Sequence, residues 1–228
     1  MKLTEAKLKQ LIKEVMTESA KGIADIPDGV HITAEKTSEG YVITYRTDEG
    51  KSPRKEFGFK GTIVMEEPQL VDEYPCSKAL MVSWSSASDG YGPLLYDIAM
   101  EIASLEAGGL VSDRTQVSWY NSDGSDGGAQ KVWRYYLSNR SGKGGDVTVI
   151  QLDNEDDSFK NGTQDDCLQN IARSSITGMY DTWEDSPLSK LYKKEPTTLK
   201  ALGNKIRFMG FDPLNLGSEE TEQKDLTN

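Results

Sequence analysis

The sequence predicts a mixed α/β (α+β) fold, a mostly antiparallel sheet flanked by helices and preceded by an amphipathic N-terminal helix. Strand-like runs with a period of two occupy most of residues 30–85, and the period then changes to 3.6 for a helix over 93–107. A strand, a helix and another strand follow. Because a sheet must bury a face, packing these helices against it is the most economical arrangement.

Residues 4–17 have the pattern of an amphipathic helix. Apolar side chains recur at the spacing of one helix face, with lysines on the other side: Leu8, Leu11, Ile12, Val15 and Met16. Gly22 to Asp28 then indicates a linker that ends in a Pro-Asp-Gly turn. The predicted helix either packs on the domain or is a separate recognition segment.

Four strand-like runs come next, at residues 30–36, 40–47, 56–66 and 77–85. The first two are separated by the turn sequence Ser38-Glu39-Gly40, which favours an antiparallel meander. In the second run Val42, Thr44 and Arg46 alternate with Ile43, Tyr45 and Thr47. This alternation predicts at least one half-buried face of the sheet.

The following helix, over 93–107, has Pro93 in its first turn and ends at Gly108-Gly109. The remaining elements are predicted as a strand at 110–112, a helix at 129–140, a strand at 146–152, helices at 165–174, 187–193 and 197–202, and a last strand at 205–209. The predicted organisation is therefore an N-terminal helix in 1–22, a core in 28–152, a helical extension in 153–216 and a mobile acidic tail in 217–228.

The charge balance limits the classes of partner. The 228 residues carry a net charge of −11, from 37 acidic and 26 basic residues. This charge opposes sequence-independent binding of DNA or RNA, where neutralisation of phosphates dominates affinity. No run approaches the roughly 20 apolar residues of a membrane span, and no secretory leader is recognised. We expect neither a nucleic-acid nor a membrane partner, and a cytoplasmic or virion-internal location.

The residues that most often bind metals are scarce. The two cysteines, Cys76 and Cys167, form no C-x-x-C pair, and His31 is the one histidine. The sequence therefore has almost no cysteine or histidine residues from which a zinc site or a histidine-based triad could be formed. We expect no metal cofactor.

The segment Asp89-Gly90-Tyr91-Gly92-Pro93 lies between the fourth strand and the helix at 93–107. Two glycines and a proline at a strand-to-helix junction predict a tight turn with unpaired backbone N–H groups at the start of the helix. Such groups bind anions. The candidate site of the protein is therefore expected at this turn.

Residues 30–152 resemble the GNAT superfamily of acyl-CoA-dependent N-acetyltransferases. The resemblance rests on the element order, on Gly90-Tyr91-Gly92-Pro93-Leu94-Leu95-Tyr96 and on Ala129-x-x-Val132-Trp133, which is similar to the family's Ala-x-x-Leu-Tyr segment. In that family an Arg/Gln-x-x-Gly-x-Gly/Ala loop binds the CoA pyrophosphate through backbone amides. The resemblance implies acetyl-CoA as cofactor, a splayed strand pair beside an open groove, and binding by Ser85, Gly90, Tyr91, Gly92, Pro93, Leu94 and Leu95.

Three positions depart from the family pattern. Ala87 stands where Arg or Gln is expected, Asp89 puts a carboxylate beside the anion site, and Trp133 replaces the tyrosine that is often the general acid. Tyr135 and Tyr136 are the candidate catalytic acids in its place. Because Tyr136 shares a helix face with Trp133, we expect Tyr136 in the core and Tyr135 to be the freer of the two.

Acidic residues supply the candidates for a general base that deprotonates an ammonium substrate. They are Glu67, with its neighbour Glu66, at the end of a strand, and Asp97 with Glu101, four residues apart on the helix. A solvated helix or strand face is the alternative for each, and a water relay needs none of them. Arg114 either pairs with Asp113 in a local turn or binds a carboxylate or phosphate of the substrate.

Two functions follow from the resemblance. The first is transfer of an acetyl group from acetyl-CoA to an amine on a small molecule or protein, which depends mainly on positioning. The second is the same fold without catalysis, in a structural, virion-associated or host-interaction role. The N-terminal segment from Met1 to Met16 resembles the openings of proteins from large tailed phages. Within it and just after it, Leu3-Thr4-Glu5-Ala6 and Met16-Thr17-Glu18-Ser19 resemble sites cut by phage prohead proteases. That resemblance implies a phage or host protein partner at the N-terminal helix, and a host-cytoplasmic or virion location.

Overall fold

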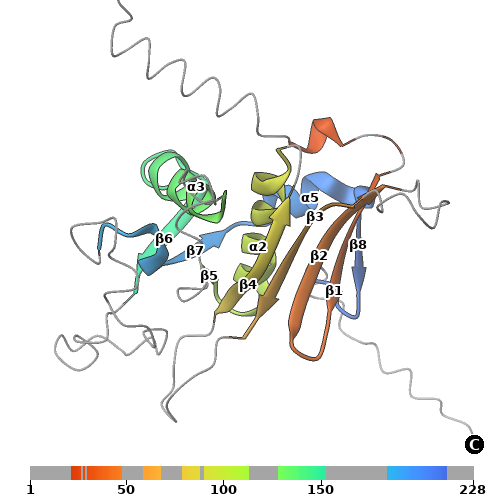
Figure 1. Cartoon of the computed structure of the whole chain (residues 1–228), viewed down its shortest axis with the longest axis horizontal. Helices are drawn as coiled ribbons and strands as arrows, with labels where there is room; N and C mark the ends of the chain where they lie inside the picture. Colours follow the sequence, from red (N-terminus) through yellow and green to blue (C-terminus); the bar gives the residue numbers. More distant parts are fainter. Residues whose placement is uncertain are drawn as a thin grey trace, which may run out of the picture.

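The protein is a mixed α/β structure built on one eight-stranded sheet. The computed structural model describes residues 22–26, 28, 30–47, 59–67, 79–87, 90–112, 128–152 and 184–214. The strand order is β6-β7-β5-β4-β3-β2-β1-β8, and most neighbouring pairs are antiparallel (Figure 1). The predicted mixed, mostly antiparallel sheet is confirmed, whereas the predicted N-terminal helix at 4–17 lies outside the described residues.

An antiparallel meander forms half of the sheet. It consists of β1 (Val30–Lys36), β2 (Gly40–Thr47), β3 (Phe59–Glu66) and β4 (Leu80–Ala87). The hydroxyl oxygen of Thr37 accepts hydrogen bonds from the N–H groups of Glu39 and Gly40 and so closes the β1–β2 turn. The sequence prediction is confirmed for β1 and β2. The strand β3 is described from Phe59 and ends at Glu66 as predicted, whereas β4 begins three residues later and ends two residues later than predicted.

A β-bulge changes the side-chain phase of β4. Met65 pairs with Val82 while Val64 pairs with Trp84, so Ser83 is an extra residue. Val82 before the bulge is buried in the core, and Ser85 after it bonds to the helix on that same face. Trp84 consequently lies on the other face of the sheet, where its side chain is 52% exposed.

The longest helix is α2 (Gly92–Glu106), which connects β4 to the parallel strand β5 (Leu110–Ser112). Its residues from Leu94 to Ala103 are buried except Asp97, as expected of a helix packed on several sides. The Ala103 carbonyl accepts the N–H groups of Gly108 and Gly109, both with positive φ, and this ends the helix as predicted.

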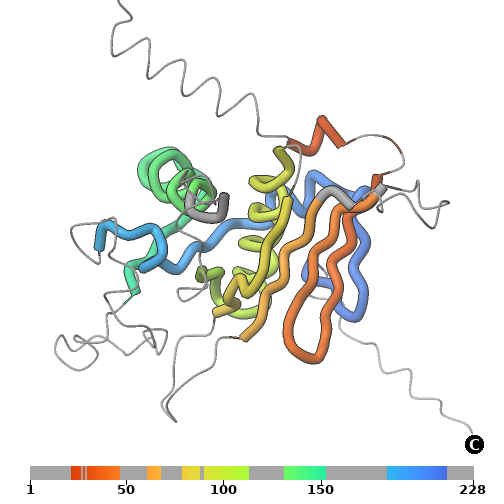
Figure 2. The backbone as a smooth tube through the Cα atoms, in the orientation of Figure 1, coloured from red at the N-terminus to blue at the C-terminus, as the bar shows by residue number. Residues whose placement is uncertain are grey.

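Two short elements lie near the start of α2. Figure 2 shows η1 (Ile23–Asp25) beside it, and the Tyr91 hydroxyl donates to the Asp25 carbonyl at 3.1 Å. The helix α5 (Thr197–Leu202) packs against α2 on the same side of the sheet. The loop-to-helix junction is thus enclosed by elements from both ends of the described chain.

The helical region after β5 consists of α3 (Gly128–Tyr135), which continues as the π-helical turn η2 (Tyr136–Arg140), and it leads to β6 (Val147–Gln151). Both helical pieces pack toward α2 through Trp133 and Tyr136. The predicted helix at 129–140 and strand at 146–152 are confirmed within one residue.

The C-terminal part of the chain belongs to the sheet. After η3 (Pro187–Ser189), β7 (Lys190–Lys194) inserts between β5 and β6, and after α5 and η4 (Gly203–Lys205), β8 (Ile206–Met209) pairs in parallel with β1. The predictions of a helix at 197–202 and a strand at 205–209 are confirmed. The described part of the expected helical extension, 184–214, therefore completes the core sheet.

The predicted helix at 187–193 is wrong. Tyr192 is buried in the main core, while Leu191 is buried in a second cluster with Ala79, Val111 and Leu152. Because a strand buried on both faces has no alternation of apolar and polar residues, its sequence gives no period of two.

Candidate functional site

The predicted anion-binding turn exists at the start of α2. Gly90 has φ 81°, in the left-handed region that glycine adopts readily, and Tyr91 occupies the N-cap position. The N–H group of Leu95 makes an intrahelical bond to the Tyr91 carbonyl. The side chain of Tyr91, the N-cap residue, makes no capping hydrogen bond. N–H groups of this first turn therefore have no intrahelical acceptor.

Most side chains of the predicted cofactor-binding set hold the turn in place. The ring of Tyr91 is buried and stacks on Tyr45 with ring centroids 4.3 Å apart. Leu94 and Leu95 are also buried. Any anion at this turn would therefore be held by backbone groups, at Gly90 and Gly92 above all.

The end of β4 lies directly beside the turn. A Cβ atom on Gly92 would lie 3.8 Å from the Cβ of Ala87, which is exposed. The hydroxyl oxygens of Ser85 and Tyr96 are 3.1 Å apart, and burial raises the pKa of Tyr96 to about 12. Ser85 is thus bonded to α2 itself.

Tyr136 is brought to the first turn of α2. Its hydroxyl lies 2.9 Å from the Pro93 carbonyl and 2.8 Å from the carboxylate of Asp97, and its one proton donates to either oxygen. The side chain is fully buried, and burial raises its pKa well above the ordinary value. Tyr135 is half-buried. The prediction that Tyr136 lies in the core and Tyr135 is freer is confirmed.

Trp133 fills the space between α2 and β7. It is 1% exposed, and its ring lies 5.2 Å from that of Tyr96 and 4.9 Å from that of Tyr192. An indole enclosed in this way stabilises the packing of α3 on α2.

The structure separates Glu67 from this turn. In the β3–β4 register Gly61 pairs with Ala87, next to the turn, whereas Glu66 pairs with Met81 at the opposite end. Six residues of strand place Glu67 about 20 Å from Gly61. Glu67 is therefore not a general base for chemistry at the α2 turn, a relation that only strand register reveals. Arg114, Asp113 and Asp89 lie outside the described residues.

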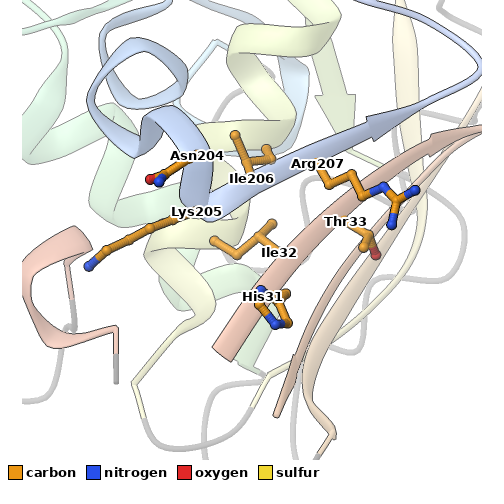
Figure 3. A pocket seen from close by; sticks show the side chains of 7 residues that line it. All are labelled: His31, Ile32, Thr33, Asn204, Lys205, Ile206 and Arg207. Carbon is orange, nitrogen blue, oxygen red and sulfur yellow. The ribbon is translucent and has the colours of Figure 1, made fainter. Parts of the chain in front are cut away.

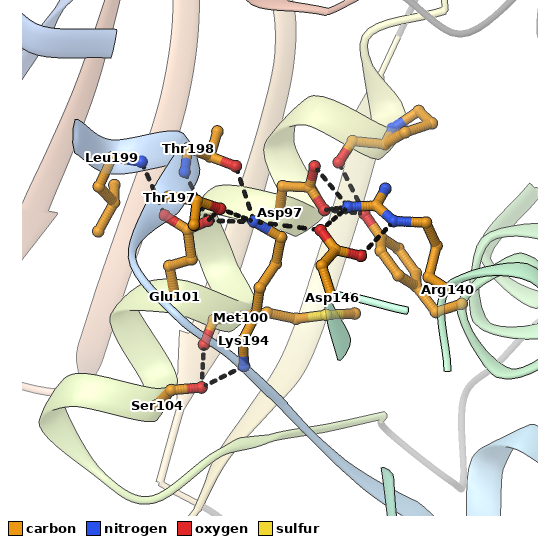
Figure 4. Close-up of polar contacts among 12 residues, drawn as sticks. Asp97, Met100, Glu101, Ser104, Arg140, Asp146, Lys194, Thr197, Thr198 and Leu199 are labelled. Carbon is orange, nitrogen blue, oxygen red and sulfur yellow. Dashed lines mark hydrogen bonds and ion pairs between the residues drawn. The ribbon is translucent and has the colours of Figure 1, made fainter. Parts of the chain in front are cut away.

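A partly buried charged cluster joins α2 to the C-terminal elements. We use this name for Asp97, Glu101, Arg140, Asp146 and Lys194 (Figure 4). Lys194 forms an ion pair with Glu101 in which the side chains are 1% and 0% exposed. Asp97 is mostly buried. The alternative of a solvated helix face for Asp97 and Glu101 is wrong.

Glu101 also caps a neighbouring helix. Its two carboxylate oxygens accept the N–H groups of Thr198 and Leu199, each at 2.7 Å. The N-cap position of α5 is Pro196, which has no side-chain acceptor. Glu101 supplies that acceptor from α2, and Lys194 compensates its charge.

Arg140 connects the remaining two carboxylates. Its Nε donates to Asp146 at 2.6 Å, and its Nη2 lies 3.4 Å from Asp97. The hydrogen bond from Arg140 lowers the pKa of Asp146, whereas burial raises the pKa of Asp97. The two partners of each ion pair lie on different segments of the chain. The cluster therefore holds α2, η2, β7 and α5 together. Its sequence signal is two acidic residues, four apart, within an otherwise apolar helix.

The described residues include no group of three or more His, Cys, Asp or Glu side chains that could hold a metal ion. In the same part of the chain, none of the helices has the length and apolar character needed to cross a membrane. Comparison with protein-family models, curated proteins and solved structures found no match to this chain.

Proposed function

We propose that this protein is an acyl-CoA-dependent N-acyltransferase that transfers an acetyl group from acetyl-CoA to an amine acceptor. The observation that carries the proposal is the β4–α2–β5 unit, in which two parallel strands are joined by a helix whose first turn follows the carboxyl end of β4. In open sheets, ligands lie outside the carboxyl ends of such strands. A helix N-terminus there favours the pyrophosphate of CoA.

The short contact between the parallel strands supports a groove at that end. Pairing is described for three residue pairs, from Leu80–Leu110 to Val82–Ser112. β4 then continues to Ala87, and described β5 ends at Ser112. A strand pair that separates beyond Val82 would give a cofactor access to the backbone of the bulged part of β4.

Acetyl-CoA, when bound, supplies a thioester carbonyl that an amine can attack directly. Gly90 and Gly92 would bind the pyrophosphate through the backbone. Tyr136 keeps its proton at neutral pH because burial raises its pKa, and its hydroxyl lies at the first turn. Its bonds to Asp97 and Pro93 make it a positioning residue. Tyr135, the less buried of the two, is then the proton donor to the leaving thiolate.

Calorimetric titration of acetyl-CoA tests the binding step. Gly92→Glu puts a carboxylate at the first turn, where it has room and is compatible with the helix dipole. Repulsion of about 1–4 kcal/mol between like charges predicts binding weaker by about fivefold or more. Gly92→Gln, which adds the same bulk without charge, should bind within about threefold of the unchanged protein. No heat from the unchanged protein at millimolar acetyl-CoA would reject the proposal.

A non-catalytic structural or host-interaction role is the second candidate. Trp133 favours it, because the residue at the family's general-acid position is buried between two tyrosines and cannot donate a proton in that role. In this case Gly92→Glu leaves biological activity intact, whereas Leu11→Asp, on the apolar stripe of residues 4–17, abolishes it. The reverse pattern would support the enzyme.

A further inference from the structure

A cavity lies at the β8 edge of the sheet, where β8 pairs with β1 (Figure 3). It has a volume of about 440 Å³ and is lined by His31, Ile32, Thr33, Asn204, Lys205, Ile206 and Arg207. Cavities of roughly 300–1,000 Å³ are typical of small-molecule sites. The cavity is therefore large enough for a ligand of modest size.

The polar residues of the cavity form a positively charged rim. Thr33 pairs with Arg207 across the two strands, and Lys205 directly precedes β8. None of the lining residues is acidic. Within the described part of the chain, neither Lys205 nor Arg207 forms an ion pair with a carboxylate. These cations are therefore available to an external anion.

Arg46 adds to this positive field from the next strand. It pairs with His31 in the β1–β2 register and is exposed. Directly opposed residues of an antiparallel pair lie on the same face of the sheet. A cluster of one charge sign, in a protein with a net charge of −11, favours an anionic ligand at this edge.

The remaining lining residues are apolar. Ile32 and Ile206 pair directly across β1 and β8, and both are buried. Successive residues of a strand alternate between the two faces of the sheet, so the Ile32 and Ile206 side chains lie in the core on the face opposite to Thr33 and Arg207. The cavity therefore suits a small molecule that presents a carboxylate or phosphate group to the cationic side chains. The guanidinium of Arg207 can bind either group through two parallel hydrogen bonds.

We propose that the cavity at β1 and β8 binds a small anion, with its carboxylate or phosphate group on Arg207 and Lys205. This site is distinct from the α2 turn. Directly paired residues form one row across the sheet, through Ala87, Gly61, Tyr45, Ile32 and Ile206. The α2 turn and the cavity therefore lie at the same end of the sheet, with β3, β2 and β1 between them.

Amide NMR spectra of the full-length protein test the proposal, with phenyl phosphate, phenylacetate and inorganic phosphate as probes. At least one of the three probes should shift the amide signals of 31–33 and 204–207 saturably. Comparing phenyl phosphate with phenylacetate identifies the preferred anionic group. Signals of 90–95 report the α2 turn separately, so failure at one site is distinguished from failure at the other.

The substitution Arg207→Gln should weaken probe binding by about tenfold, the effect of losing one charge-assisted contact. Lys143→Gln, which removes an exposed charge outside the cavity, should leave the affinity unchanged. Equal melting temperatures of the two variants would show that the loss is local. The proposal is overturned if no probe shifts these amides, if sodium chloride at equal ionic strength reproduces the shifts, or if Arg207→Gln binds as tightly as the unchanged protein.

Discussion

Lys194 of β7 and Glu101 of α2 form a buried ion pair between residues 93 positions apart in the sequence. The pair joins the helix that carries the candidate site to the strand that separates β5 from β6. Ser104 strengthens the same contact, since its hydroxyl oxygen accepts the backbone N–H of Lys194 at 2.9 Å. The position of α2 therefore depends on the C-terminal part of the chain.

Breaking this ion pair should strongly destabilise the protein. Lys194→Met leaves the Glu101 carboxylate buried without its cation, and such losses cost about 3–5 kcal/mol. The measurement is the free energy of unfolding in urea. Lys193→Met, on the adjacent and less buried residue of β7, is the matched control and should change stability far less.

The double variant Glu101→Gln with Lys194→Met should lose less stability than the sum of the two single variants. A neutral amide no longer requires a cation, so the second substitution costs less once the first is present. Strict additivity of the two losses would show that the pair does not interact.

Stability should depend on pH through Asp146. The hydrogen bond from Arg140 lowers the pKa of Asp146 in the folded protein, so its ionised form is favoured by folding. Its contribution is present above the unfolded pKa of about 3.9 and is lost as the pH falls through the lower folded pKa.

Asp146→Asn therefore destabilises the protein at pH 7, by about 1 kcal/mol or less because the side chain is 43% exposed. Urea unfolding of both proteins between pH 7 and pH 3 should show this difference narrowing toward the acid end. A difference of equal size at both ends would contradict the assignment.

Tyr136→Phe should affect stability and leave the affinity for acetyl-CoA unchanged. It removes the hydroxyl that donates to Asp97 or to the Pro93 carbonyl, and an unsatisfied buried acceptor costs about 1–3 kcal/mol. Tyr135→Phe is the matched variant and should barely change the melting temperature. If Tyr136→Phe instead lowers kcat more than about 100-fold with KM unchanged, Tyr136 itself is the general acid.

Gly61→Ala should destabilise the junction of β3, β4 and α2. The added Cβ would lie 2.6 Å from Cδ1 of Leu95 and 3.0 Å from the carbonyl oxygen of Ser86, so the Leu95 side chain or the helix that carries it must shift. Overpacking of this kind costs about 1–3 kcal/mol. Gly92→Ala has 3.8 Å to its nearest neighbour and should leave the melting temperature nearly unchanged. Equal effects of the two substitutions would rule out the close contact as the cause.

Local patterns located most elements of the sheet from the sequence. Strands 30–36, 40–47 and 110–112 agree with the structure because turn residues bound them. The helix after Pro93 and its end at Gly108-Gly109 follow from equally local rules. The strand at 190–194 was missed because both of its faces are buried, against different partners. Its sequence therefore lacks the alternation of apolar and polar residues that predicts a strand.

The candidate site likewise combines features that local sequence patterns predict with features that depend on strand pairing. The turn Gly90-Tyr91-Gly92-Pro93 was recognised because glycine, proline and helix-start chemistry act within a few residues. The distance of Glu67 from that turn depends on the β3–β4 register, and the cavity at Arg207 depends on the parallel pairing of β8 with β1. Neither relation has a local signal in the sequence.

The sequence by itself determined the order of the strands and α-helices from β1 to β6, the α2 turn and the burial of Tyr136, since each depends on backbone propensity or helix periodicity. Only the tertiary structure decided the environment of the charges. From the sequence, Glu101 could equally lie on a solvated helix face. In the structure it is buried, caps a neighbouring helix and pairs with Lys194. The physical reason is that desolvation and pairing of a charge depend on residues that folding brings together, here across 93 positions of the chain.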